Sequence, residues 1–123
     1  MKVKSYRDLE VWQRAMSVAK AVYLLTASFP KEEVYGLTSQ MRRAAVSIPA
    51  NIAEGWGRRY TAEFIQSLRI ANGSRTELET LLILAIQVNM CQEGQALPIL
   101  QELQALGKQL VTLERSLSRQ AKP

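Results

Sequence analysis

Six arginines in the middle of this 123-residue chain are the residues whose type and spacing could do chemistry. They are Arg42, Arg43, Arg58, Arg59, Arg69 and Arg75. A guanidinium group presents a flat fork of donors that suits phosphate, and its plane stacks on bases. Residues 36–75 hold these six bases and only two acids, so this segment has a net charge of +4 in a chain of +5. We therefore expect a negatively charged partner to contact this segment.

Two aromatic residues stand beside the second arginine pair: Trp56 lies between two glycines, and Tyr60 follows Arg59. Such rings can stack a nucleobase while the neighbouring cations hold phosphate. If the helices that carry them are antiparallel neighbours, all six arginines gather around one end and flank of the protein. The predicted nucleic-acid-binding residues are therefore Arg42, Arg43, Trp56, Arg58, Arg59, Tyr60, Arg69 and Arg75.

The same arginines also have a structural interpretation, as solvated side chains and ion-pair partners. For Arg43 and Arg75 we favour internal pairing, with Glu54 and Glu79 as the partners. For the second arginine pair both roles stay open. Glu54 itself is expected to pair with an arginine or to cap backbone donors.

Catalytic chemistry has few residues to draw on. The chain has no histidine, which removes the commonest general base and the commonest transition-metal ligand. Its one cysteine, Cys91, cannot form a disulfide within the chain and is expected to be a buried apolar residue. We therefore expect a protein that is not an enzyme, with no catalytic residues, no metal site and no cofactor.

The sequence shows no targeting or membrane signal. The first residues have neither a long apolar core nor a small-residue cleavage site, so no signal peptide is expected. The longest apolar run, Leu81 to Ile86, has six residues, against about 20 for a membrane span. We expect a cytoplasmic protein without a membrane partner.

Helical periodicity predicts the elements that position the arginines. Apolar residues recur at three- and four-residue steps in four segments, 8–29, 37–55, 61–91 and 97–119. Asp8 and Thr61 are placed to cap the first and third helices. Short turns between amphipathic helices predict an all-α fold, an antiparallel up-down-up-down four-helix bundle formed by residues 1–123 as one domain.

The first predicted helix carries two apolar stripes, one through Trp12 and Met16 and the other through Val11 and Ala15. A single stripe is enough to face the core of a bundle. Two stripes predict burial on two sides, with either the fourth helix or another subunit covering the second side.

Prolines and glycines predict the local features of the other helices. Pro49 predicts a kink and not a stop, because the apolar spacing continues past it. Gly55 is placed as the residue that ends the second helix, so residues 55–59 are predicted to form a turn. Gly73 predicts close packing inside a continuous third helix, and Pro98 is expected in the first turn of the last helix.

The sequence also resembles a known family, most densely between residues 5 and 90. The run QMRRAAVSIPANIAEGWGR, residues 40–58, carries the most specific part of the likeness. Its motif residues are Pro49, Asn51, Glu54 and Gly55. Together these residues resemble the four-helix-bundle proteins of the 23S rRNA intervening-sequence family, also labelled S23 ribosomal proteins. One departure is Arg75-Thr76, where the family more often has an apolar residue.

The resemblance implies a small bacterial bundle that assembles as a homo-oligomeric ring, a homopentamer. Many members are encoded inside insertions in ribosomal RNA genes. A related bundle is the accessory protein of diversity-generating retroelements, which binds reverse transcriptase and nucleic acid through a basic surface. We therefore expect a non-enzymatic oligomer that binds nucleic acid, specifically RNA, through its arginine-rich surface. The alternative is an adaptor that binds a protein such as a reverse transcriptase.

Overall fold

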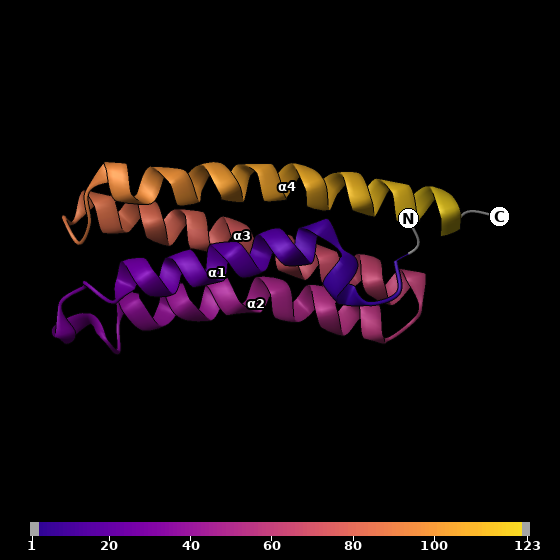
Figure 1. Cartoon of the computed structure of the whole chain (residues 1–123), viewed down its shortest axis with the longest axis horizontal. Helices are drawn as coiled ribbons and strands as arrows, with labels where there is room; N and C mark the ends of the chain where they lie inside the picture. Colours follow the sequence, from indigo (N-terminus) through magenta and orange to yellow (C-terminus); the bar gives the residue numbers. More distant parts are fainter. Residues whose placement is uncertain (1–2, 122–123) are drawn as a thin grey trace.

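The computed structural model describes residues 3–121, which form four long helices and no strand (Figure 1). The helices are α1 (Glu10–Thr26), α2 (Leu37–Gly57), α3 (Thr61–Gln87) and α4 (Glu93–Ala121). Two single-turn 3₁₀ helices, η1 (Tyr6–Asp8) and η2 (Lys31–Glu33), precede α1 and α2. The predicted all-α bundle is confirmed. None of the helices in the described part of the chain is both long and apolar enough to cross a membrane.

Each helix packs against the next, and α4 closes the bundle against α1. Polar contacts show the direction of packing, because Arg14 of α1 pairs with Glu102 and Glu10 contacts Gln109, at 3.2 and 3.4 Å. Later positions of α4 thus meet earlier positions of α1. Figure 1 shows the same alternation of direction for successive helices.

The core follows the apolar spacing of the sequence. Leu103, Leu106 and Leu110 of α4 are at most 2% exposed and face the buried side chains of the other helices. On α1 the stripe through Val11 and Ala15 lies in this core. The stripe through Trp12 and Met16 is only partly buried: several of its side chains are exposed to solvent in the single chain.

The predicted helix ends differ from the observed ones at several places. Helix α1 begins at Glu10, because Ser5 starts a separate turn and the Asp8 carboxylate accepts the backbone N–H of Ser5 at 3.1 Å. Thr61 does not cap α3: Tyr60 holds that position and makes no side-chain capping bond. Asp8 and Thr61 were therefore wrongly expected to be caps.

Helix α4 begins at Glu93, four residues earlier than predicted. The backbone N–H of Gln92 donates to Gln95 Oε1 at 2.9 Å, which fixes this earlier start. Pro98 therefore lies inside the helix, beyond its first turn, and removes one backbone bond. Helices α1 and α3 end at Thr26 and Gln87, three and four residues before the predicted ends.

Helix α2 runs past both Pro49 and Gly55, as far as Gly57. Pro49 is thus no stop, as predicted, whereas Gly55 was wrongly expected to end the helix. Gly55 is buried, and a Cβ there would lie 2.6 Å from the Ser67 Oγ of α3 and overlap with the rest of that side chain. Its function is close approach between α2 and α3, while a Cβ at Gly73 would meet nothing within 4 Å, contrary to expectation.

Candidate nucleic-acid interface

The six arginines occupy three separate places on the bundle, so the expectation that they form one patch is wrong. The first pair lies in the N-terminal half of α2 and the second at the α2–α3 turn. At 1.5 Å per residue, the 16 residues from Arg42 to Arg58 span about 24 Å. The remaining two lie on α3 and contact α4 or their own helix.

The two arginines of α3 are held by carboxylates. Arg69 pairs with Glu114 of α4 at 3.1 Å. The Arg75 guanidinium pairs with Glu79, as predicted, donates to Asn72 Oδ1 at 2.7 Å and is only 15% exposed. A Cβ at Gly107 of α4 would lie 2.6 Å from its Cζ, so that glycine makes room for it. We call this region the α3–α4 flank.

The first arginine pair lies beside the end of α1. Arg42 donates from Nε to Thr26 Oγ1 at 2.8 Å, and its guanidinium lies 4.6 Å from the centroid of the Tyr23 ring. Neither Arg42 nor Arg43 forms an ion pair with any residue that the structure describes. The predicted pair between Arg43 and Glu54 is therefore wrong. Tyr23, as the partner of Arg42, was missed because only folding brings α1 beside it.

Arg58 and Arg59 lie at the end of α2, where the chain turns into α3. Arg58 reaches Glu54 and Glu63 at 3.7 and 3.8 Å, with all three side chains about half exposed or more. Pairs of this kind contribute little free energy in water. Arg59 has no ion pair within residues 3–121.

The backbone of Arg59 is strained. Its φ is +69°, in the left-handed region, where a residue with a Cβ is about 1–2 kcal/mol less stable. Glycine is the usual residue at this position after a helix, yet Gly57, two residues earlier, lies inside α2. Strained residues of this kind concentrate at functional sites.

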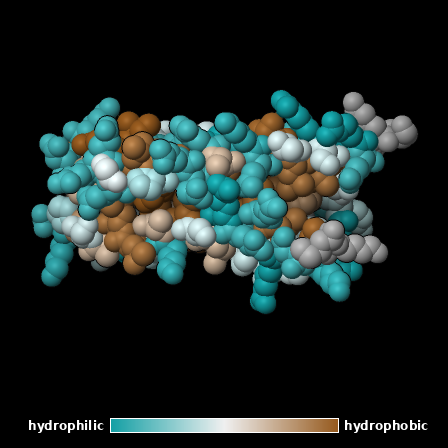
Figure 2. Space-filling view, turned by 45° about the horizontal axis from the view of Figure 1, so that its top comes forward, coloured by the Kyte–Doolittle hydropathy of each residue, from teal (hydrophilic) through white to brown (hydrophobic). Residues whose placement is uncertain are grey.

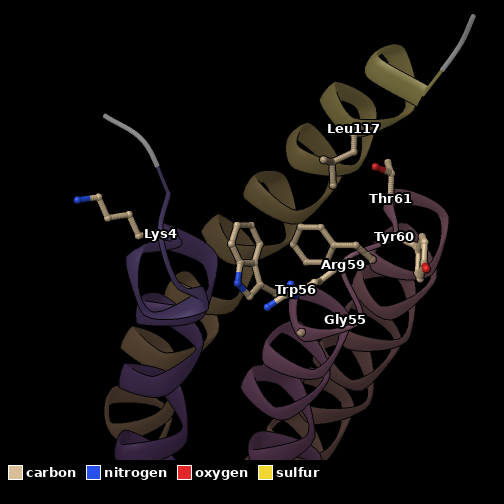
Figure 3. Close-up of a pocket in the computed structure, with 9 residues that line it drawn as sticks. Lys4, Gly55, Trp56, Arg59, Tyr60, Thr61 and Leu117 are labelled. Carbon is tan, nitrogen blue, oxygen red and sulfur yellow. The ribbon is translucent and has the colours of Figure 1, made fainter.

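A pocket of about 540 Å³ opens at this turn (Figure 3). Residues from the N-terminal segment, α2, the α2–α3 turn, α3 and α4 line it: Lys4, Gly55, Trp56, Gly57, Arg59, Tyr60, Thr61, Phe64 and Leu117. Two of them are cations, and no acidic residue is among those that the structure places around it. Lys4 and Leu117 come from the two ends of the chain, so no local sequence signal identified them. We call this region the α2–α3 end.

Trp56 is half-buried at the pocket and lies inside α2, not in a turn as predicted. Its ring meets the Phe64 ring edge to face, with 6.0 Å between centroids, and both pack against the core. Tyr60 is 71% exposed, and Figure 3 shows it on the side of the pocket opposite Lys4. The arrangement offers one packed aromatic wall, Trp56, and one exposed ring, Tyr60.

The motif residues fix α2 against α3 below this pocket. Asn51 Nδ2 donates to the carbonyl oxygen of Ser47 at 2.7 Å, and the Ser47 hydroxyl lies 2.9 Å from that of Ser74 on α3. Together with Gly55, this polar contact holds the two helices close. Asn51 and Gly55 therefore help to position the site, and Gly55 also lines the pocket. Pro49 is buried inside α2.

Other reactive groups are few. Burial raises the pKa of the Cys91 thiol, which keeps it protonated and unreactive at neutral pH. Within residues 3–121, no three thiol or carboxylate groups are placed to hold a metal ion.

Comparison with known proteins agrees with this fold. A solved structure from Bacteroides thetaiotaomicron, a protein of unknown function from the S23 ribosomal protein family, is 25% identical with a TM-score of 0.77. The similarity covers 85% of this chain and 95% of that chain. No curated protein matches. A family profile described as 23S rRNA-intervening sequence protein matches residues 7–112, so the chain belongs to that family.

Proposed function

We propose that this protein is a non-enzymatic, cytoplasmic bundle that binds RNA at the α2–α3 end. The observation that carries the proposal is Arg59, which has no ion pair with a described residue and a strained backbone, beside an aromatic pocket whose described lining holds no acidic residue. Phosphate needs accessible cations, and bases need accessible aromatic faces. Both are present at this end.

Arg42 and Arg43 extend the proposed contact. They form no ion pair with a described residue and lie about 24 Å along α2 from the pocket. An RNA strand that lies along the bundle can reach both places. Arg69 and Arg75 are weaker candidates, because Glu114 and Glu79 already occupy their guanidinium groups.

We further propose that the protein acts as a homo-oligomer, a homopentamer. Apolar side chains of α1 that would complete its second stripe stay exposed, with Met16 at 44% and Tyr23 at 46%, and Leu24 beside them is 69% exposed. Figure 2 shows apolar patches that reach the surface between polar side chains. A second copy that covers α1 would bury them. A ring also repeats the α2–α3 end, so that weak individual contacts gain avidity.

The experiment is titration of a labelled structured RNA, followed by fluorescence anisotropy, at salt from 50 to 200 mM. We expect the affinity to fall steeply across this range. The arginines release counterions from the RNA phosphates when they bind, and added salt opposes that release. An affinity that is flat across the range argues against the proposal. Light scattering of the same sample gives the number of copies, and a monomer at binding concentrations would contradict the ring.

A second candidate function is an adaptor for a protein partner such as a reverse transcriptase. The observation that favours it is Tyr35, which is 96% exposed in the connector before α2. Exposed aromatic residues often anchor protein interfaces. Pull-down of a reverse transcriptase by this protein, with and without nuclease, separates the two. Capture that survives nuclease and is lost in Tyr35→Ser supports the adaptor.

A further inference from the structure

We propose, on the basis of the RNA-binding function above, that the pocket at the α2–α3 end binds an unpaired nucleobase, with the attached phosphate at Arg59. The ligand is therefore a single-stranded RNA segment and not a duplex.

The walls of the pocket suit a flat aromatic ligand. Trp56 is held by Phe64 at 6.0 Å between ring centroids, so its orientation is set before any ligand arrives. Leu117 of α4 and Phe64 add apolar surface on either side. The volume of about 540 Å³ lies within the range of about 300–1,000 Å³ that is typical of small-ligand sites.

The rim of the pocket suits a single negative charge. Arg59 lines it and has no ion pair with a described residue, whereas the ammonium group of Lys4, which also borders the pocket, points away from Trp56 in Figure 3. The Arg59 backbone adopts its left-handed conformation although Gly57 is only two residues away. A non-glycine residue held in this conformation is a candidate for a functional role, and the proposal gives the Arg59 side chain one.

The requirement for an unpaired base follows from stacking. In a duplex both faces of each base are covered by its neighbours, so a protein ring reaches a base face only where the strand is single or the base is turned out. Sequence-tolerant proteins that bind single strands combine aromatic rings with a cationic track in the same way.

The test uses Trp56 as its own reporter. The chain has two tryptophans, so Trp12→Phe leaves Trp56 as the only one, and Phe keeps an aromatic ring against Tyr6. Three probes of equal length are titrated: an oligouridylate single strand, an RNA duplex, and an abasic oligomer with the same sugar-phosphate backbone. Circular dichroism establishes that the variant keeps its helices.

We expect the single strand to quench Trp56 emission, and the abasic oligomer to bind roughly tenfold more weakly without quenching. The duplex should behave like the abasic oligomer. Trp56→Leu keeps an apolar side chain against Phe64. In this variant the affinity for the single strand should fall by the same factor of roughly ten, while the affinity for the abasic oligomer should not change.

The outcomes separate the two proposals. If all three probes bind equally and Trp56 emission does not change, the base pocket is overturned while RNA binding stands. If the duplex quenches as strongly as the single strand, the preference for unpaired bases is overturned. If no probe binds, RNA binding fails, and the base pocket fails with it.

Discussion

The α2–α3 end and the α3–α4 flank both combine a glycine with arginines, but the two residue types have opposite roles in the two regions. On the flank, Gly107 makes room for Arg75, whose guanidinium is then enclosed by Glu79 and Asn72. At the α2–α3 end, Gly55 allows α3 to pack closely against α2. Arg58 and Arg59, which follow it, remain outside this contact. The role of an arginine is thus set by the groups that lie across from it, and composition alone does not distinguish the two cases.

The largest effect is expected from a substitution that disrupts the close contact between α2 and α3. In Gly55→Ala, the new Cβ overlaps with the Ser67 side chain, which is short and cannot move away. We expect the free energy of unfolding to fall by about 3 kcal/mol in urea denaturation. Gly107→Ala should lower it less, because the displaced atoms are the flexible end of Arg75. Equal effects would show that the two glycines do not differ in this way.

The next effect separates stability from binding on the flank. Arg75→Gln leaves Glu79 partly buried without its cation, so we expect the free energy of unfolding to fall by about 1–2 kcal/mol. RNA affinity should stay the same, because this guanidinium is enclosed. Denaturation and anisotropy on one preparation measure both. A variant that stays stable but binds RNA more weakly would show that Arg75 belongs to the RNA interface.

The smallest effect concerns the strained residue. Arg59→Gly removes the strain of the left-handed φ, which stabilises the folded protein, but glycine also makes the unfolded chain more flexible, which favours unfolding. We expect a net stabilisation of about 0.5 kcal/mol. RNA affinity should fall, since one cation is lost. Arg59→Ala loses the same cation and keeps the strain. If the glycine variant is less stable than the alanine variant, the strain at this turn is not real.

Local pattern was sufficient to predict the helices and most of the core. The leucines of α4 and the stripe through Val11 lie where their spacing placed them, because helical periodicity is a local property. The ion pair of Arg75 with Glu79 was also predictable, since both lie four residues apart on one helix.

Contacts between distant segments could not be predicted in this way. The local pattern predicts a helix end at Gly55, because the residue that constrains it, Ser67, lies on another helix. The pocket includes Lys4 and Leu117, which only folding brings to the same place. Trp56, Arg59 and Tyr60 stand close together in the sequence, but the sequence did not indicate the pocket that they line.

The salt dependence of RNA binding in two matched double variants tests the central claim most directly. Arg58→Gln with Arg59→Gln removes two cations from the α2–α3 end, and Arg69→Gln with Arg75→Gln removes two from the flank. We expect the first to lower the slope of log affinity against log salt by roughly 1–2 for an RNA strand, and the second to leave it unchanged. The same loss of slope in both variants, or a loss only in the flank variant, would contradict the account.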